Sequence, residues 1–400
     1  MQTLMDVYQN LYAEVIPVIY RMNMDGVPVD VERLKQVREF LKALISDYEE
    51  KIFEETGHKI NVKSPPQVAD LLFNSLKMTP YKGEKTGKKT LEKLAYKYQS
   101  DIPKYIIDLR AGYKELNLFS SENIIDGHIK CEYSPRASTG RFKSRKGRGR
   151  GGMNLQNVKV GEQRKFFIPP PGHVMIGADQ KQAEAMAVGW FADDSRMQSM
   201  FDSGKSLHLE NLYNVFGVRI TSAEKDTNLL YKVAKGLIHG GNYGLGPWKF
   251  ARMANIPFAE AKKHLDTYHR TYPGIRKNFH GFVQSELKRS RMLYNPFGRR
   301  QVFFSRMNDD TFRAGYAFLP QSTISDINKT ALKQIAKHYR ILIELHDGLY
   351  IAVPEGEVKF GIEAMQEAYD VRFYIWGIQR RIPIDVSIGP NWDEMQKVDI

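Results

Sequence analysis

The stretch ILIELHDGLYIAV, residues 341–353, predicts a β-hairpin with an acidic residue in its turn. Two apolar runs rich in β-branched residues flank the tripeptide HDG, and such runs around a glycine-containing turn are typical of paired strands. A carboxylate in a tight turn, here Asp347, is most often a turn residue. The hairpin therefore indicates antiparallel β-structure but, taken alone, no chemistry.

The rest of the chain is predicted to be mainly helical. Apolar residues recur at helical spacing within residues 1–60, 103–118 and 181–285, and a further helix is expected at 357–377. A last strand is expected near 382–388. The predicted fold class is α+β, with a small sheet flanked by two mainly helical lobes.

The composition is that of a soluble globular protein that attracts polyanions. Of 400 residues, 42% are hydrophobic and 26% are charged, which excludes a disordered or fibrous chain. The net charge of +13 makes nucleic acid the expected partner and an anionic membrane surface the second choice. The single Cys131 excludes an intrachain disulfide. The sequence has neither a signal-peptide pattern nor an apolar run of about 18 residues, so we expect no membrane span and a cytoplasmic location.

A second apolar run, VMIGA at 174–178, ends at Asp179 and provides a partner for Asp347. Alone, Asp179 is explained equally well as a helix cap. Strand ends of one sheet hold two carboxylates side by side, and adjacent carboxylates repel unless a divalent cation lies between them. Mg²⁺ binds one or two carboxylates together with substrate phosphates. The pair therefore predicts two-metal phosphoryl transfer, in which one ion activates the attacking hydroxyl and the other stabilises the leaving group.

A helix predicted from about residue 222 to 243 carries polar residues on one face. We expect the capping box Thr221-x-x-Glu224 to open it. Residues spaced by four share one face, and here they are Tyr231, Lys235, His239 and Tyr243. Half-buried packing is the alternative explanation, but three glycines in this helix each cost about 1 kcal/mol relative to alanine. They are Gly236, Gly240 and Gly241. We therefore predict a nucleotide that lies against this helix, with its phosphates at Lys235.

Residues 136–150 carry seven basic side chains, three glycines and no acid. The basic residues are Arg136, Arg141, Lys143, Arg145, Lys146, Arg148 and Arg150. The tetrapeptide NLQN follows at 154–157, and its amides suit base edges and sugars as well as phosphates. A plain polar loop explains this tetrapeptide equally well. We predict that Lys143–Arg150 is a flexible strap along a nucleic-acid backbone.

Taken in order, these segments resemble the polymerase module of family A DNA polymerases, the relatives of bacterial DNA polymerase I, in a phage-like variant. The motifs are TGR at 139–141, NLQN at 154–157, DQKQAE at 179–184, AKGLIHGGNYG at 234–244, PQ at 320–321, HD at 346–347 and NWD at 391–393. The resemblance implies a right-hand polymerase fold with an antiparallel-sheet palm. Its implied parts are an N-terminal segment on the palm (1–29), a helical thumb (30–118), the palm (119–185 and 300–400) and helical fingers (186–299). We expect no 3′–5′ exonuclease domain in this chain.

The resemblance implies roles for individual residues. Asp179 and Asp347 would bind two Mg²⁺ ions, and Lys235 would be a third catalytic residue. Glu184 would be a steric gate that crowds C2′ of the incoming sugar and excludes ribonucleotides. The implied nucleotide-binding residues are Gln180, Glu184, His208, Lys235, His239 and Tyr243. The implied primer–template contacts are Arg110 and Lys114 on a thumb helix, and Arg141, Asn154, Gln156, Arg313, Gln321 and His346 near the primer–template junction.

Three positions depart from the family pattern. Tyr231 stands where the family usually has an arginine that contacts the triphosphate. In this chain that contact is absent or comes from Lys232. His239 replaces a phenylalanine or tyrosine, which leaves discrimination at the sugar 3′ position open. Gly348 stands where a glutamate commonly follows the second aspartate, so an accessory carboxylate is missing.

The expected function is template-directed addition of deoxynucleotides to a primer 3′-OH, with release of pyrophosphate, in DNA replication or repair. The expected partners are primer–template DNA and deoxynucleoside triphosphates in a bacterial or phage-infected cell. A processivity factor and an exonuclease on another chain are left open. One alternative is a single-subunit RNA polymerase. Glu184 argues against it, because a ribonucleotide enzyme needs free space at that position. The other is a catalytically silent nucleic-acid-binding protein, which has no need of both aspartates.

Overall fold

The computed structural model describes residues 4–80, 85–147, 151–221, 224–225 and 228–399. It divides into two compact units. Unit 1 comprises Met1–Pro28 and His128–Ile400, and unit 2 comprises Val29–Gly127.

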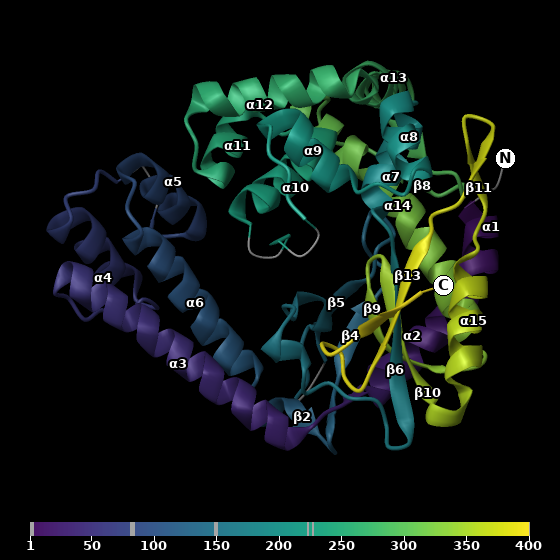
Figure 1. The fold of residues 1–400 in the computed structure, drawn as a ribbon, viewed down its shortest axis with the longest axis horizontal. Helices are drawn as coiled ribbons and strands as arrows, with labels where there is room; N and C mark the ends of the chain where they lie inside the picture. The colour runs from purple at the N-terminus through teal and green to yellow at the C-terminus, as the bar shows by residue number, and fades with distance from the viewer. Residues whose placement is uncertain (1–3, 81–84, 148–150, 222–223, 226–227, 400) are drawn as a thin grey trace. The chain divides into compact units, whose positions relative to one another are not determined.

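Unit 1 is built on a five-stranded antiparallel sheet (Figure 1). In spatial order its strands are β14 (Gln396–Val398), β13 (Ile384–Gly389), β6 (His173–Gln180), β10 (Gly348–Pro354) and β9 (Arg340–Leu345). The predicted hairpin is β9 and β10, and Asp347 lies in its turn. Because β6 lies between β13 and β10, Asp179 at its end has a strand on either side. The α+β class is confirmed.

Two helices cover this sheet and pack on each other, α14 (Asp309–Ile335) and α15 (Val358–Tyr369). The predicted helix 357–377 is therefore too long. The chain instead forms a second hairpin, β11 (Phe373–Ile375) and β12 (Ile378–Arg380). Its two turn residues, Trp376 and Gly377, have φ angles of 53° and 77°. A two-residue turn with positive φ matches the twist of paired strands, and it ends any continuation of the helix.

A helical layer follows β6 in the chain, as predicted. It contains α7 (Ala183–Phe191), α8 (Ser195–Asp202), α9 (Leu207–Phe216), α10 (Leu229–Asn242), α11 (Pro247–Ala254), α12 (Phe258–Thr271), η7 (Ile275–His280) and α13 (Gly281–Ser290). In Figure 1, α12 runs across α9, α10 and α11, and all three pairs are in contact. The hairpin of β7 (Met292–Tyr294) and β8 (Arg300–Val302) leads from this layer to α14.

Helix α10 begins later than predicted. Asn228 caps it, because its side-chain oxygen accepts a hydrogen bond from the Tyr231 amide at 3.0 Å. The predicted capping pair does form, with the Thr221 amide donating to Glu224 Oε2 at 2.7 Å. That bond closes a turn ahead of the helix, so the expected start near residue 222 is wrong; residues 222–223 and 226–227 lie outside the described residues.

The remaining elements of unit 1, apart from α2, are short. They are α1 (Leu4–Val7), η1 (Tyr8–Tyr12), α2 (Ala13–Asp25), β1 (Val27–Pro28), β3 (His128–Ile129), β4 (Cys131–Ser134), β5 (Lys143–Lys146), η4 (Leu155–Asn157), η5 (Glu162–Arg164) and η8 (Glu355–Glu357). Strand β5 pairs with β4, so residues 143–146 are not the flexible loop that was predicted, while their contact with a nucleic-acid backbone stays a prediction. The segment is ordered because it forms a β-ladder with Cys131–Ser134, and its basic composition gave no sign of this pairing. Residues 148–150 lie outside the described residues.

Unit 2 is mainly helical. Its elements are α3 (Val31–Thr56), α4 (Pro65–Ala69), η2 (Asp70–Ser75), α5 (Lys88–Tyr98), α6 (Ile102–Leu118), η3 (Ser121–Asn123) and β2 (Ile124–Ile125). Asp30 caps α3 by accepting from the Arg33 amide at 3.0 Å, and Gly57 ends it with a φ of 70°. Helices α3, α5 and α6 share a core that includes Ile45, Leu94 and Ile106.

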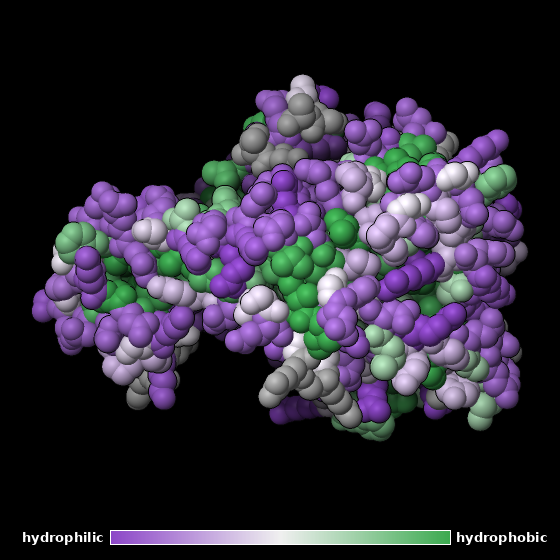
Figure 2. Space-filling model, turned by 90° about the horizontal axis from the view of Figure 1, so that it is seen from below, coloured by the Kyte–Doolittle hydropathy of each residue, from purple (hydrophilic) through white to green (hydrophobic). Residues whose placement is uncertain are grey.

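The surface agrees with the composition. Hydrophilic residues predominate over apolar ones on the face shown in Figure 2. Within the described ranges, no helix is both long and apolar enough to cross a membrane.

Candidate active site

Asp179 and Asp347 lie together at one end of the central sheet. Gly348, the residue after Asp347, stands opposite Asp179 in the ladder of β6 and β10. The main-chain N–H of Gln180 donates to the main-chain carbonyl of Asp347 at 2.9 Å, and this bond fixes the hairpin turn against the end of β6. Antiparallel pairing thus brings together two aspartates that are 168 positions apart, 347 minus 179.

The electrostatics of the two aspartates favour a bound cation. Burial, and then the charges of Asp347 and Asp385, raise the pKa of Asp179 to about 7. Burial also raises the pKa of Asp347. The Asp179 side chain nevertheless remains open to solvent. Two carboxylates that resist ionisation together, yet can be reached from outside, form a donor set that fits a divalent cation.

The two aspartates do not form a metal site that protein side chains close on their own. Among the described residues, no group of three or more histidine, cysteine, aspartate or glutamate side chains is arranged to hold a metal. Mg²⁺ needs no such group, because it keeps several water ligands and takes others from substrate phosphates.

The register explains why a glycine follows Asp347. A Cβ atom at Gly348 would lie 2.7 Å from the Ala178 carbonyl oxygen and 3.0 Å from Oδ1 of Asp179. A side chain here would require the backbone of β6 or β10 to move. The missing accessory carboxylate noted in the sequence therefore has a steric reason in this chain.

Glu184, in the first turn of α7, is enclosed by three polar side chains. Tyr243 donates its hydroxyl hydrogen to Oε2 of Glu184 at 2.7 Å, and Nδ1 of His239 lies 3.1 Å from the same oxygen. Arg141 donates from Nη2 to Oε1. Burial alone would raise the pKa of Glu184, but His239, Arg141 and Tyr243 together lower it to about 2. Gln321 hydrogen-bonds to the Tyr243 side chain and extends the group.

Lys235 and His208 lie on facing helices, α10 and α9. The Lys235 side chain is exposed. Burial and the charges of Lys235 and Lys225 lower the pKa of His208 to about 4, so its imidazole is neutral near pH 7. Its Nδ1 is buried and lacks a hydrogen-bond partner among the described atoms. The ring of Tyr231, at the position where an arginine is usual, lies edge-on to His208 with 6.3 Å between ring centroids.

The glycines of α10 are explained by the protein's own packing. A Cβ atom at Gly236 would lie 2.8 Å from Met253 Cε, and one at Gly240 would lie 2.4 Å from Leu245 Cδ2. At Gly241 the nearest atom would be in the Tyr268 ring, at 2.6 Å. The inference that these glycines admit a nucleotide is therefore corrected, because side chains of α11, α12 and the following loop occupy the space.

The amides of the NLQN segment are bound inside unit 1. Asn154 donates to the Ser144 carbonyl at 2.8 Å. Gln156 accepts from the Ser144 hydroxyl at 2.8 Å and donates to Oε2 of Glu344 at 2.7 Å. Sequence reasoning missed Glu344, whose side chain is buried and whose pKa is raised by that burial.

Three other predicted residues differ in accessibility. His346 is half-buried, and burial and Arg141 lower its pKa to about 4. Arg313 on α14 is exposed and pairs with Asp310 at 2.5 Å. The Gln180 side chain is buried, and its amide nitrogen lies 3.4 Å from the Ile324 carbonyl oxygen. Only the backbone of Gln180 faces the hairpin turn.

The two predicted residues of unit 2, Arg110 and Lys114, also differ in accessibility. Arg110 on α6 donates to the Val62 carbonyl at 2.7 Å and to the Thr86 carbonyl. It thus ties two loops of unit 2 to α6. Lys114, one turn later, is exposed.

Asp385 is a carboxylate of this site that sequence reasoning missed. It stands opposite Asp179 in the ladder of β13 and β6. Lys181 and Lys397 pair with it at 2.9 Å and 3.0 Å. These bonds outweigh burial and lower the pKa of Asp385, so a stable negative charge lies beside Asp179.

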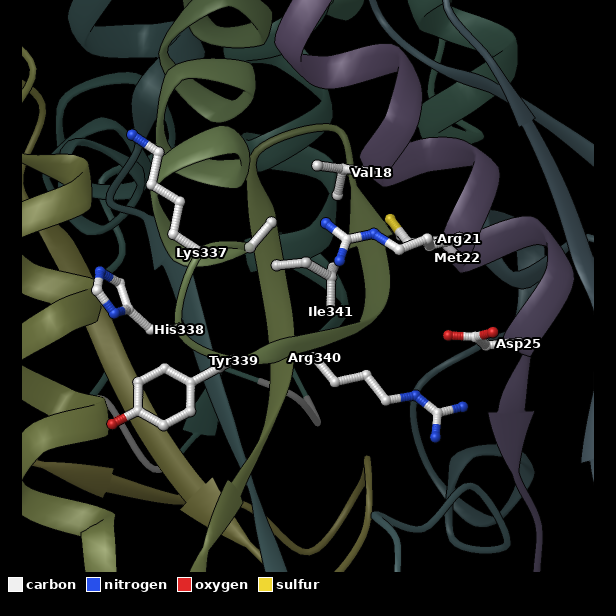
Figure 3. A pocket seen from close by; sticks show the side chains of 10 residues that line it. Val18, Arg21, Met22, Asp25, Lys337, His338, Tyr339, Arg340 and Ile341 are labelled. Carbon is white, nitrogen blue, oxygen red and sulfur yellow. The ribbon is translucent and has the colours of Figure 1, made fainter.

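A cavity of about 380 Å³ lies elsewhere in unit 1, between α2 and the turn that joins α14 to β9 (Figure 3). Arg21 and Arg340 line it, and in Figure 3 the side chains of Lys337, His338 and Tyr339 extend away from those two arginines. No predicted site residue lines this cavity. The predicted site residues therefore lie outside this cavity.

Known proteins resemble the chain over nearly its whole length. DNA polymerase I of Chloroflexus aurantiacus is 26% identical over 421 residues, which cover 98% of this chain and 43% of the relative. DNA polymerase I of Caldicellulosiruptor bescii is 27% identical and is covered to 47%. The thermostable DNA polymerase I of Thermus thermophilus is 25% identical and is covered to 49%. The chain thus spans about half the length of these relatives.

A solved structure has the same fold. The POL domain of Pol1 from M. smegmatis, in complex with DNA primer-template and dNTP, aligns with a TM-score of 0.80 at 23% identity. The alignment covers 96% of this chain and 70% of that one. The sequence profile described as DNA polymerase family A matches residues 31–394. The chain belongs to DNA polymerase family A.

Proposed function

We propose that this chain catalyses template-directed transfer of deoxynucleotides to a primer 3′-OH, with release of pyrophosphate. The observation that carries the proposal is the pair Asp179 and Asp347 at adjacent strand ends, with the Glu184 carboxylate five residues beyond Asp179. The family membership supports it, and so does the M. smegmatis POL domain, which was solved with primer-template and dNTP.

Asp179 and Asp347 are the residues proposed to hold two Mg²⁺ ions. Such ions, when bound, make the primer hydroxyl a better nucleophile and neutralise charge on the leaving pyrophosphate. The chain's own contribution is positioning. Lys235 is exposed on α10 and is proposed to bind the triphosphate, beside a His208 that carries no charge of its own.

Glu184 is the proposed sugar gate. Arg141, His239 and Tyr243 hold its carboxylate in one place and keep it ionised. A carboxylate fixed in this way excludes a sugar 2′-hydroxyl by occupying its space, and it does so without moving. Lys114, Arg313, His346 and Gln321 stay proposed primer–template contacts.

The parts of the family fold are proposed as follows. Unit 2 corresponds to the segment predicted as the thumb, the helical layer from α7 to α13 to the fingers, and the five-stranded sheet with α14 and α15 to the palm. The N-terminal helix α2 contacts α14, which supports its assignment to the palm.

Primer extension in parallel reactions tests the proposal. The purified chain is given a labelled primer–template with deoxynucleotides, with ribonucleotides, or with deoxynucleotides and a chelator. We expect extension only with deoxynucleotides and metal. Preferred use of ribonucleotides would favour the RNA polymerase alternative, and DNA binding without extension would favour the silent binding protein. A mismatched primer in the same assay should keep its 3′ end, because we expect no exonuclease activity in these 400 residues.

A further inference from the structure

We propose that Lys329 is a positioning residue, which holds the loop at Gly140 and through it sets Arg141 against Glu184. The inference rests on the proposed function, because it assigns to Lys329 an indirect part in sugar selection. It starts from a charged side chain on α14 that the proposed mechanism does not use.

Lys329 is completely buried, with a side-chain exposure of 0%. Its ammonium group donates to the Gly140 carbonyl and to the Ser325 hydroxyl, the latter at 2.5 Å. It also lies 4.7 Å from the centroid of the Phe142 ring. The contacts to Gly140 and Phe142 come from the two residues that flank Arg141 in the chain.

A second, largely buried cation lies against the same loop. Arg299 donates from Nε to Oδ2 of Asp326 at 2.9 Å, and its guanidinium fills the space beside Gly140. A Cβ atom at Gly140 would lie 2.7 Å from Arg299 Cζ, and the φ angle there is +78°. Glycine is therefore required at this position on both steric and conformational grounds. Lys329 and Arg299 therefore both lie against this loop.

Two buried carboxylates, Asp326 and Glu344, act on the charge of Lys329. Asp326 is the carboxylate between the two cations, 4.0 Å from Lys329 Nζ and hydrogen-bonded to Arg299. Burying charges costs more than their attraction returns unless the geometry is excellent, and apolar side chains of similar volume usually serve stability as well or better. A role in positioning accounts for Lys329, since it is the buried donor to a carbonyl one residue from Arg141.

The contacts continue from this loop to the proposed gate. Arg141 follows Gly140 directly and donates to Oε1 of Glu184. Its side chain is 19% exposed, and its Nε is buried without a hydrogen-bond partner among the described atoms. The guanidinium is therefore not fixed by its own hydrogen bonds at Nε. Its position depends on the backbone at Gly140, which Lys329 holds.

The test compares two lysines on the same helix. Lys329→Met removes the donor to Gly140 and keeps an unbranched side chain. Lys333→Met, one turn later, removes a comparable donor, which bonds to the Asn10 carbonyl at 2.8 Å and to Glu14. The readout is the ratio of kcat/KM for a ribonucleotide to that for the matching deoxynucleotide. We expect Lys329→Met to raise this ratio about tenfold and Lys333→Met to leave it unchanged.

A double-mutant cycle separates positioning from loss of stability. If Lys329 acts through Arg141, then Lys329→Met adds nothing to the selectivity change caused by Arg141→Ala. Additive effects, or an unchanged ratio in Lys329→Met, would overturn the inference. If Lys329→Met does not fold, Gly140→Ala displaces the same loop and keeps the buried charges, and the same change in selectivity is expected. An unchanged ratio in a folded Gly140→Ala protein would equally overturn it.

The same cycle, read by unfolding free energy, needs no polymerase activity. Lys329 and Arg141 should be coupled, because removing either one frees the same loop. If wild type and Lys333→Met both fail to extend a primer, the proposed function is wrong. The coupling free energy between Lys329 and Arg141 in unfolding still decides whether Lys329 positions Arg141. Simple additivity in unfolding would count against positioning.

Discussion

The hydroxyl of Tyr243 lies 2.7 Å from Oε2 of Glu184, so the C-terminal end of α10 is bonded to the first turn of α7. His239, one turn before Tyr243, contacts the same oxygen at 3.1 Å. The histidine that departs from the family pattern is therefore part of a polar enclosure around Glu184. This contact places His239 beside Glu184, the proposed sugar gate.

Removal of the gate carboxylate should relax sugar selection. In Glu184→Ala, Tyr243 and Arg141 lose their shared acceptor and the space beside the sugar opens, so ribonucleotide use should rise at least about tenfold relative to deoxynucleotide use. Single-nucleotide incorporation kinetics measure the ratio. Glu363→Ala, at an exposed position of α15, is the matched control and should behave as wild type. Unchanged selectivity in Glu184→Ala would show that another residue forms the gate.

Acid should remove the contribution of Glu184 to stability. Its pKa is lowered from 4.5 to about 2 in the folded protein. Below about pH 4.5 the unfolded chain therefore binds a proton at this residue before the folded one does, and stability falls as pH falls. The difference in unfolding free energy between wild type and Glu184→Gln should be largest near neutral pH. It should shrink by about 2 kcal/mol at about pH 3. Urea titrations of both proteins measure it; a difference that does not change with pH would contradict the assigned cause.

The two strand-end aspartates should be essential for catalysis and dispensable for DNA binding. Asp179→Asn and Asp347→Asn keep the shape of the side chain and remove its charge, so extension should fall below about a tenth of the wild-type rate, a loss above about 1.4 kcal/mol in the barrier. Primer–template affinity, measured by fluorescence anisotropy without nucleotide, should stay near wild type. The comparison variant Asp385→Asn, whose charge is already shared with Lys181 and Lys397, should retain more activity than either.

The hairpin of β4 and β5 should contribute salt-dependent DNA affinity. Lys143 and Lys146 are exposed, whereas Arg145 is paired with Glu132. Each cation that neutralises a duplex phosphate adds about 0.9 to the slope of log affinity against log salt, so replacing both lysines with serine should reduce the slope by roughly 2.

The control for this hairpin replaces Lys337 and Lys359 with serine, which removes the same charge from exposed positions elsewhere in unit 1. Its slope should match wild type, and sequence preference should stay the same in both variants, because phosphate contacts carry no base information. Equal slopes in all three proteins would show that the hairpin does not contact the duplex.

Substitution of Arg110 should lower the stability of unit 2, whereas substitution of Lys114 should weaken DNA binding. Arg110→Met removes charged hydrogen bonds to the carbonyls of Val62 and Thr86, so unit 2 should lose about 2–3 kcal/mol of stability. Lys114→Met alters an exposed position and should change stability by less than about 0.5 kcal/mol, while it weakens DNA binding. Denaturation of the two variants in urea, with primer–template affinity measured in parallel, provides both readouts. An Arg110→Met protein as stable as wild type would show that the hydrogen bonds to Val62 and Thr86 do not stabilise unit 2.

The sequence by itself determined the elements that depend on neighbours in the chain. The hairpin at 341–353 follows from β-branched runs on either side of His-Asp-Gly, and the strand that ends at Asp179 follows from five apolar residues in a row. Such patterns report which residues are buried and where the chain turns, and both are local properties. Together with the order of the motifs, they were sufficient to predict the fold class and the family.

Only the tertiary structure decided which side chains are partners. Gln156 binds Glu344, 188 positions away, and Lys329 binds the Gly140 carbonyl, 189 positions away. The glycines of α10 accommodate Met253, Leu245 and Tyr268, although their cost to helix stability suggested a nucleotide. A side chain's hydrogen-bonding capacity can be read from its type, but its partner depends on how distant segments pack. Helix and strand periodicity carries no information about that packing, because it specifies only the face on which a residue lies.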